Sequence, residues 1–510
     1  MVKTKDKATF PDNGVIYEGD YYRGIPFFDY LHKQEIPDEK IYDIRDFGAV
    51  GDGVTLCTEA INDALEAARE NGGGTVLIDG GLYCSGTLRI YSRTKLFITT
   101  SSALVASKDL SQYTDAFVIM DNADNSMICG GGRIIGNGEY FVYPPLKKPR
   151  LEPLDKIKLP PVLYDPMGYP VDTIRYEIRS RIRYAEDRYG YGLPKIQRPM
   201  YMVWLHNCNH SGVSNICLEG AMDWNLCVDG CDNIEIKDVV INGNRHVANT
   251  DGIDVMGSSN VDVRHCFVSC ADDGLVVKAP RGHEHDGINV SDDSKMGGTH
   301  HVHFEDCVVL TVANSFKIGT ETFYDISDIS VENCHFMLPD IYPGTCSGIA
   351  IESSDGSNVS NVRVKNITMD NVSCPLFVCL NKRNKFGYVD EQDKEKRYFG
   401  GSIEEVTIEN VKAVNAEVPS IITGYRMEDD KGKDLGKIDI KSFSVEYRDD
   451  IEEINLLSSI HESVTDYPEN NSFGDVPAYG IFIRHAPYVT LEDINIVPRS
   501  MNTRECIVKC

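Results

Sequence analysis

Three aspartates between residues 249 and 278 have the types and the spacing for acid–base chemistry. Asp251 lies in an Asn-Thr-Asp-Gly segment, and Asp272 and Asp273 are adjacent in Ala-Asp-Asp-Gly. Each cluster is followed by glycine and then by a run of alternating apolar residues, which is typical of a strand. Carboxylates that lie close together repel one another unless chemistry, a metal ion or protonation makes use of them. The three aspartates are therefore the first candidate catalytic residues.

The spacing of these aspartates predicts that they lie on neighbouring turns of a β-solenoid. Asp251 and Asp273 are 22 residues apart and stand at the same position relative to their strands. That offset is about one solenoid turn, and neighbouring strands lie about 4.8 Å apart. We therefore expect Asp251, Asp272 and Asp273 to cluster on one face. Asp-Gly is also ordinary turn chemistry, but two aligned pairs with an additional aspartate favour catalysis.

A repeating strand motif extends from about residue 200 towards the C-terminus. Two alternating apolar residues are followed by a polar residue and then by two more alternating apolar residues. Units begin at Ile234, Val261, Val302, Ile329, Val362, Val406, Ile438 and Val489, at intervals of 27, 41, 27, 33, 44, 32 and 51 residues. A constant motif at variable intervals indicates stacked rungs with insertions on one side. The sequence predicts an all-β, single-stranded right-handed parallel β-helix; a β-sandwich of hairpins fits poorly because the repeat is directional.

Composition assigns the segments outside the repeat. Residues 1–40 predict an N-terminal arm, residues 41–500 a β-helix catalytic domain and residues 501–510 a C-terminal tail. Residues 59–71 have helical spacing after a capping Thr58, and this helix would cover the open N-terminal end of the solenoid. Residues 141–198 carry 12 Lys and Arg against 7 Asp and Glu. They predict a basic helical insertion that is a lid, a subunit contact or a solvated helix docked on the acidic body.

The overall composition narrows the class of protein. The chain of 510 residues is 42% hydrophobic and has a formal charge of −27, from 78 acidic and 51 basic residues. Such an acidic chain is expected to bind neither nucleic acid nor an anionic membrane. No apolar secretory region is visible near the first residue, and no stretch is long enough to span a bilayer. We therefore expect a cytoplasmic protein with reduced cysteines, although a trimmed secreted chain would look the same.

The cysteines have a structural interpretation. Cys266, Cys307 and Cys334 share one position of the repeat and predict a stack of buried thiols in the core. A Cys-x-x-Cys pair, which a structural zinc site would need, is absent from the sequence. We expect no cofactor and no bound metal ion.

The order of motifs resembles glycoside hydrolase family 28, the polygalacturonase-like enzymes of the pectin-lyase-like right-handed β-helix superfamily. The similarity covers about residues 41–500 and includes Asp46-Phe47-Gly48-Ala49, Gly51-Asp52-Gly53, Arg198-Pro199, Asn249-Thr250-Asp251 and Asp272-Asp273. It implies an inverting hydrolase in which Asp272 is the general acid, while Asp251 and Asp273 hold and deprotonate the water. Independently, inversion needs a protonated carboxyl and a carboxylate-bound water on opposite sides of the bond, roughly 6.5–9.5 Å apart. Crowding of carboxylates keeps one protonated near neutral pH.

Three positions depart from the family pattern. Asn314 stands where the family has the histidine of Gly-His-Gly, and Ala350 and Glu352 replace the cations of Arg-Ile-Lys. On a strand, residues 350 and 352 point the same way, outward if residues 349 and 351 are core. The resemblance implies that, in the family, the arginine and the lysine at these two positions bind a substrate carboxylate. A uronate beside Glu352 would instead be repelled.

Two lysines can compensate for the lost cations. Lys278 and Lys317 occupy outward positions of neighbouring strands, and Lys317 can bridge the aspartates and Glu352. Charge balance and contact with a substrate carboxylate are equally good interpretations of both lysines. The residues expected to bind substrate are Asn249, Lys278, Asn314, Lys317 and Glu352.

The sequence predicts a glycoside hydrolase that cleaves a glycosidic bond in an oligosaccharide or glycoside, with ordinary polygalacturonate a poor substrate. Two rival enzymes are a β-helix polysaccharide lyase, in which the aspartates would hold Ca²⁺, and a sugar epimerase. A non-catalytic carbohydrate-binding β-helix would keep the sugar site but would not need an aligned aspartate triad. The sequence leaves open the sugar, the linkage, endo or exo action and whether the chain forms a homo-oligomer.

Overall fold

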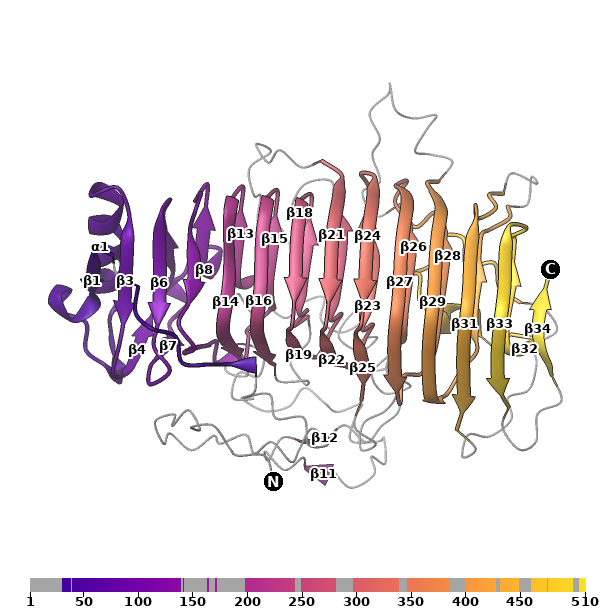
Figure 1. The fold of residues 1–510 in the computed structure, drawn as a ribbon, viewed down its shortest axis with the longest axis horizontal. Coiled ribbons are helices and arrows are strands. Elements are labelled where there is room, and N and C mark those ends of the chain that lie inside the picture. The colour runs from indigo at the N-terminus through magenta and orange to yellow at the C-terminus, as the bar shows by residue number, and fades with distance from the viewer. Residues whose placement is uncertain are drawn as a thin grey trace, which may run out of the picture.

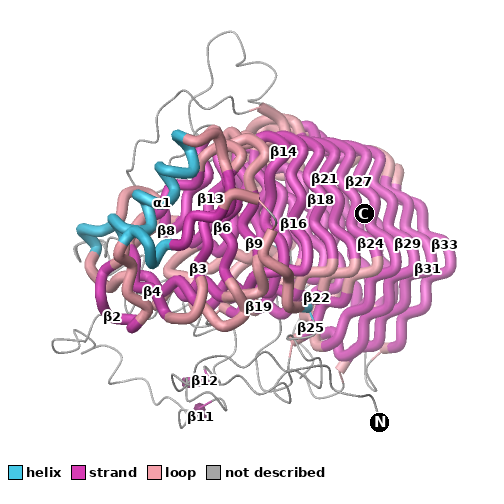
Figure 2. Tube along the Cα trace, turned by 60° about the vertical axis from the view of Figure 1, so that its left-hand side comes forward, coloured by secondary structure: helices cyan, strands magenta, loops and turns pink. Residues whose placement is uncertain are grey.

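The computed structural model describes residues 30–37, 39–138, 141, 163–164, 170–171, 198–243, 249–280, 297–338, 346–384, 400–427, 432–448, 460–474, 476–498 and 504–510. Within these ranges the chain winds into a solenoid whose strands stack in parallel along one long axis (Figure 1). Figure 2 shows the stack from a direction closer to that axis, with successive rungs in line behind one another. The predicted all-β parallel solenoid is confirmed. Its right-handed sense stays a prediction.

Twelve strands form the sheet that carries the candidate catalytic residues, which we call the site sheet. In spatial order these strands are β5 (Leu88–Ile90), β8 (Ala116–Asp121), β13 (Tyr201–His206), β15 (Trp224–Asp229), β17 (Ile253–Met256), β20 (Leu275–Ala279), β23 (Phe316–Thr322), β26 (Ser347–Ser353), β28 (Cys374–Leu380), β30 (Ser420–Thr423), β32 (Ala478–Arg484) and β34 (Glu505–Lys509). Every strand of this sheet is parallel to its neighbours.

The remaining long strands belong to a second, twenty-stranded sheet, which we call the long sheet. It consists of β1 (Ile41–Asp43), β2 (Asp52–Leu56), β3 (Gly74–Ile78), β4 (Leu82–Ser85), β6 (Thr94–Ile98), β7 (Ala103–Ala106), β9 (Met127–Cys129), β10 (Arg133–Ile135), β14 (Asn209–Glu219), β16 (Asp232–Asn242), β18 (Ser259–Arg264), β19 (Phe267–Cys270), β21 (Thr299–Glu305), β22 (Val308–Thr311), β24 (Ile326–Glu332), β25 (His335–Met337), β27 (Asn358–Asp370), β29 (Ser402–Ala416), β31 (Ile438–Tyr447) and β33 (Val489–Val497). Short 3-10 helices lie at η3 (Ile44–Phe47), η4 (Leu110–Gln112) and η6 (Asn470–Phe473).

The predicted repeat sets the register of the long sheet. The first residues of consecutive units are paired, Ile234 with Val261, Val261 with Val302, Val302 with Ile329, Ile329 with Val362, Val362 with Val406, Val406 with Ile438 and Ile438 with Val489. A slip of one residue would turn each apolar set out of the core, and full burial of one such side chain is worth about 1.5–3 kcal/mol. The apolar spacing therefore specifies the register, whatever the length of the insertion between rungs.

Alternation also decides which side chains of the site sheet point outward. Ile349 and Ile351 of β26 lie in the central core, as expected. Ala350 and Glu352 therefore point to the other side of the strand. The predicted thiol stack is confirmed in the same core, where the Cys307 side chain interacts with those of Cys266 and Cys334. All sixteen cysteines have free thiols.

Helix α1 (Thr58–Glu70) lies at the N-terminal end of the stack (Figure 1). It buries Ile61, Ala64, Leu65 and Ala68. The prediction that Thr58 caps this helix is wrong. Cys57 occupies the N-cap position without a capping bond, and the Thr58 hydroxyl instead accepts a hydrogen bond from the Gly86 amide at 2.8 Å. The role of α1 as a cap of the solenoid stays a prediction.

The predicted segment boundaries are only partly tested. The boundary of the expected tail at 501–510 stays a prediction, and within it β34 pairs with β32 and adds a strand to the site sheet. The described part of the N-terminal arm lies against the long sheet, where Tyr30 stacks on His265 and the His32 amide donates to Asn215. Most of the basic insertion at 141–198 lies outside the described residues, apart from the short antiparallel pair β11 (Leu163–Tyr164) and β12 (Pro170–Val171). The helices within the described ranges are each too short or too polar to cross a membrane.

Candidate active site

Asp251 and Asp273 occupy equivalent turns that lead into β17 and β20. Ile253 pairs with Leu275, and the Gly252 amide donates to the Asp273 carbonyl at 2.8 Å. A Cβ atom added to Gly252 would lie 2.3 Å from the Gly274 carbonyl oxygen. The glycine after Asp251 is therefore required by close packing of neighbouring turns, and the repeated Asp-Gly reflects both the solenoid and its site.

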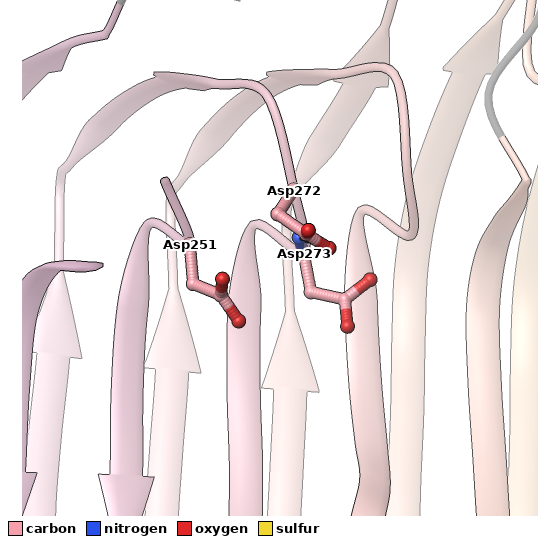
Figure 3. A group of neighbouring side chains, drawn as sticks. All are labelled: Asp251, Asp272 and Asp273. Carbon is pink, nitrogen blue, oxygen red and sulfur yellow. Dashed lines mark hydrogen bonds between the residues drawn. The ribbon is translucent and has the colours of Figure 1, made fainter. Parts of the chain in front are cut away.

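The three aspartates converge, as predicted from their spacing. One carboxylate oxygen from each of Asp251, Asp272 and Asp273 lies within 4.8 Å of the others (Figure 3). Asp251 and Asp273 are buried, whereas Asp272 is half-buried. Asp272 Oδ1 accepts a hydrogen bond from the Asp273 amide at 3.0 Å. The more accessible Asp272 carboxyl is thus the one that an external molecule reaches most easily.

A buried lysine holds Asp251. Lys278 Nζ of β20 lies 3.2 Å from Asp251 Oδ2, 2.8 Å from Asp254 Oδ1 and 4.0 Å from Glu321 Oε2. The same ammonium lies 3.8 Å from the centroid of the Trp224 ring. A cation over an aromatic face is attracted by the ring quadrupole. Lys278 is therefore enclosed by carboxylates and one indole, with 4% of its side chain exposed.

A second buried lysine holds Asp273. Lys317 Nζ of β23 lies 3.1 Å from Asp273 Oδ2 and 4.0 Å from Glu352 Oε1. The other oxygen of Asp273 accepts hydrogen bonds from Asn314 Nδ2 at 2.8 Å and from the Asn314 amide at 3.1 Å. The predicted bridge of Lys317 between the aspartates and Glu352 is confirmed. Asn314 orients a catalytic candidate from the equivalent turn of the next rung.

The surroundings shift the pKa values of the two buried aspartates, Asp251 and Asp273, in opposite directions. Burial raises the pKa of Asp251 well above its ordinary value, and the attraction of Lys278 does not offset it. Burial also acts to raise the pKa of Asp273, but the Lys317 charge and the Asn314 hydrogen bond outweigh burial and lower it. Neighbouring carboxyls with separated pKa values are what acid–base catalysis needs. Asp273 is the member of the pair that stays ionised.

Comparison with known proteins now decides the family. The sequence model of glycosyl hydrolases family 28 matches residues 193–459, just over half of the chain, and this range contains all three aspartates. The chain belongs to family 28.

Known relatives of this family 28 chain are distant. It is 22% identical over 350 residues to a probable polygalacturonase of Arabidopsis thaliana, covering 66% of this chain and 60% of the relative. It is 25% identical over 341 residues to a probable polygalacturonase of Vitis vinifera, covering 66% and 62%. The chain thus spans about three fifths of the length of these two relatives. The crystal structure of an exopolygalacturonase from Thermotoga maritima shares the fold, with a TM-score of 0.61 and 17% identity over 92% of this chain and 94% of that one.

The departures from the family 28 pattern lie in a covered part of the site sheet. Ala350 and Glu352 point outward but are both fully buried. Neither oxygen of Glu352 has a hydrogen-bond partner, and burial raises its pKa to about 8 despite the nearby Lys317. The interpretation that Glu352 faces a substrate is therefore not met in this conformation.

Asn249 lies two residues before Asp251 in the chain. It is half-buried, and its Oδ1 accepts a hydrogen bond from Arg198 at 3.4 Å. Arg198 also contacts Asp223 Oδ2 at 2.7 Å. Of the five residues expected to bind substrate, Asn249 remains accessible, whereas Lys278, Asn314, Lys317 and Glu352 are buried.

Several residues of the site were not singled out from the sequence. Burial raises the pKa of Asp223 to about 8, against the opposing effect of Arg198. Asp254 is fully buried beside Lys278, and burial raises its pKa to about 6. Asp254 had a signal, because it is an outward carboxylate on the strand that follows Asp251. Trp224 and Tyr467, whose ring centroids lie 3.8 Å from Lys278 Nζ and 5.3 Å from Lys317 Nζ, had none, since an aromatic residue in a strand or loop is ordinary.

The aspartate triad is also the group of carboxylates in the described residues that approaches metal-binding geometry. Hard cations such as Ca²⁺ prefer oxygen ligands in this arrangement. Here, however, lysine ammonium groups already lie 3.2 Å from Asp251 and 3.1 Å from Asp273. A divalent ion would have to share these oxygens with a buried positive charge, so the donor set fits a metal poorly.

Proposed function

We propose that the protein hydrolyses a glycosidic bond in an oligosaccharide or glycoside, with Asp251, Asp272 and Asp273 as its catalytic residues. The observation that carries this proposal is the convergence of the three carboxylates within 4.8 Å on equivalent turns of one sheet. Two of them are each held by a buried lysine. Membership of family 28 supports a hydrolase over a lyase, an epimerase or a non-catalytic sugar-binding solenoid.

In the proposed reaction, half-buried Asp272 is the general acid. Its carboxyl proton passes to the glycosidic oxygen as the bond from that oxygen to the anomeric carbon breaks. A water held by Asp251 and Asp273 attacks the anomeric carbon, and its proton passes to a carboxylate of this pair. Asp273 suits the role of base because Lys317 and Asn314 lower its pKa. No cofactor is needed for these steps.

We also propose that the reaction inverts the configuration at the anomeric carbon. The aspartate oxygens lie within 4.8 Å of one another, closer than the roughly 6.5–9.5 Å usual in inverting enzymes and near the roughly 5–5.5 Å of retaining ones. Retention would need one aspartate as a nucleophile. Both buried aspartates are instead tied to lysines, which lowers the nucleophilicity of a carboxylate and suits it to hold a water.

The test is incubation of the full chain with p-nitrophenyl glycosides, neutral oligosaccharides and galacturonate oligomers, with the products read by mass and by proton NMR. Hydrolysis adds one water to the products, and the first anomer seen by NMR should have the configuration opposite to that of the substrate. An unsaturated product, or activity that disappears with EDTA, would point to a Ca²⁺-dependent lyase. Lack of any product with the whole panel would contradict hydrolysis of these substrates.

We further propose that neutral sugars are preferred to polygalacturonate. Lys278 and Lys317 are already paired with buried carboxylates, so they offer little to a substrate carboxylate. A charge-assisted hydrogen bond contributes about 1.5–3 kcal/mol. Loss of one such bond corresponds to about 10- to 150-fold. The expected result is a kcat/KM at least about tenfold higher on the best neutral glycoside than on galacturonate oligomers of equal length. A kcat/KM on galacturonate oligomers equal to or higher than that on the best neutral glycoside would contradict this preference.

A further inference from the structure

A segment from far along the sequence covers the site sheet next to the aspartates. We call residues 460–474, which lie between β31 and β32, the strap. Asn381 Nδ2 donates to the Asp466 carbonyl at 3.0 Å, and the Lys382 amide donates to the Val464 carbonyl at 2.7 Å. Near the other end of the strap, Asn470 Nδ2 lies 3.2 Å from Ser347 Oγ. The strap is therefore attached by hydrogen bonds to β26 and to the residues that follow β28.

The strap accounts for the lost cation at residue 350. Ala350 packs in one apolar cluster with Phe377 of β28 and Phe473 of the strap. The rings of Phe377 and Phe473 lie 6.0 Å apart, which is within the range of favourable aromatic contacts. An arginine at residue 350 would place a charge inside this cluster, at a large desolvation cost. The strap therefore packs on the outward face of β26.

Tyr467 is a strap residue that contacts Lys317, the lysine that holds Asp273. Thr320 Oγ1 lies 2.9 Å from Tyr467 Oη, and Lys317 Nζ donates to the same oxygen at 3.5 Å. The residue as a whole is nevertheless 38% exposed. Its hydroxyl is fixed to the lysine that holds Asp273, while part of the residue faces solvent.

Two cations further restrict the Tyr467 ring. Lys317 Nζ lies 5.3 Å and the Arg383 guanidinium carbon 5.5 Å from the ring centroid. Arg383 is itself held by a 2.9 Å contact to buried Asp355. An aromatic ring that is fixed at its hydroxyl and has two anchored cations over it loses little conformational entropy on contact with a ligand. The exposed part of this preorganised residue suits contact with the apolar face of a pyranose.

We propose that Tyr467 forms a sugar-binding platform beside Asp273, contributed by the strap in place of the cation pair that Ala350 and Glu352 lack. It contacts the apolar face of a neutral pyranose ring adjacent to the scissile bond, and it does not take part in proton transfer. This proposal rests on the proposed function for its position relative to the bond. The strap lies outside residues 193–459, the range that the family 28 model matches.

The test compares Tyr467→Leu, which removes the ring but keeps an apolar side chain, with Tyr467→Phe, which keeps the ring and loses the hydroxyl. The probes are the p-nitrophenyl glycosides and neutral oligosaccharides of the panel. We expect Tyr467→Leu to raise KM about 3- to 10-fold with kcat within about twofold, and Tyr467→Phe to stay within about twofold of the parent in both. Tyr488→Leu is the matched control, because Tyr488 is 66% exposed before β33 and should change neither constant.

Several outcomes would overturn the platform. One is an unchanged KM in Tyr467→Leu; another is equal damage from Tyr467→Phe, which would assign the role to the hydroxyl and Lys317. Thermal melting of each variant separates loss of the strap from loss of the ring. If the parent hydrolyses no probe, the proposed function fails. Calorimetric titration of the same oligosaccharides into the parent and Tyr467→Leu then decides the platform separately, with equal affinities, or no heat of binding in either, contradicting it.

Discussion

Replacement of Asp272 by asparagine is expected to abolish turnover while saccharide binding survives. Asparagine keeps the shape of the side chain. Its side-chain oxygen can still accept the hydrogen bond that the Asp273 backbone amide donates to Asp272 Oδ1 at 3.0 Å. It has no carboxyl proton to give to the leaving oxygen. A general acid contributes about 10²–10⁴ in rate. We therefore expect kcat to fall at least about 100-fold on an unactivated oligosaccharide, with KM changed much less.

An activated leaving group provides a sharp control for this role. A p-nitrophenolate leaves without protonation more readily than a sugar alkoxide, so Asp272→Asn should retain a larger share of its activity on p-nitrophenyl glycosides. Asp251→Asn and Asp273→Asn should lose both activities to a similar extent, because the water is needed with either leaving group. Asp262→Asn, whose carboxylate contacts Arg264 on the exposed side of β18, should leave both activities unchanged. Near-parental kcat in all three site variants would contradict the assignment.

The rungs of the solenoid could be predicted because their determinants are local and repeated. Each unit starts with alternating apolar residues, and one correct pairing such as Val261 with Val302 fixes all the pairs in that rung. The convergence of Asp251 and Asp273 followed from the same register. Helix α1 was found from its buried Ile61 and Leu65, but its cap was not, because Thr58 bonds to Gly86 across the fold rather than to its own helix.

The environment of Glu352 could not be predicted because it depends on a contact across more than 100 residues. Alternation correctly turned Ala350 and Glu352 away from the core, but nothing local says that Ala350 packs in one cluster with Phe473 of the strap. Tyr467 and Phe473 belong to no periodic run, and their partners Lys317 and Phe377 lie on distant strands. Strand β34 escaped prediction for a related reason, since five residues give too short a pattern and only the partner strand β32 identifies it.

The second large effect is expected from Lys317→Met, which removes a buried cation without changing the length of the side chain much. Only 1% of the Lys317 side chain is exposed, and it faces Asp273 at 3.1 Å and Glu352 at 4.0 Å. Removing one partner of a buried ion pair destabilises a fold by about 3–5 kcal/mol, because an uncompensated charge stays behind. We expect a loss of this size in the free energy of unfolding at neutral pH, measured by denaturant titration. Lys365→Met is the matched control, because Lys365 is 47% exposed and 3.9 Å from Glu409, and such surface pairs contribute about 0–1 kcal/mol.

Lys317→Met should change the activity as well as the stability. The pH dependence of kcat/KM shows the direction of the change. Lys317 is the main cause that lowers the pKa of Asp273 against burial. Without Lys317, burial dominates and the pKa of Asp273 rises, so a higher pH is needed to ionise the proposed base. The acidic limb of kcat/KM should therefore move to higher pH in Lys317→Met, while the same limb in Lys365→Met stays in place. An unshifted limb would mean that Asp273 is not the group that must be ionised.

A double-mutant cycle with Glu352→Gln separates charge pairing from packing. If Lys317 and Glu352 act as a pair, then above pH 8, where Glu352 is ionised, Glu352→Gln should cost less stability in the Lys317→Met background than alone, because the carboxylate no longer has a cation to lose. Coupling between contacting residues is typically about 0.5–3 kcal/mol. The shift of the acidic limb should persist in the double variant, since Asp273 still lacks its lysine. Additive losses of stability would show that Glu352, 4.0 Å from Lys317 Nζ, is held there by packing alone.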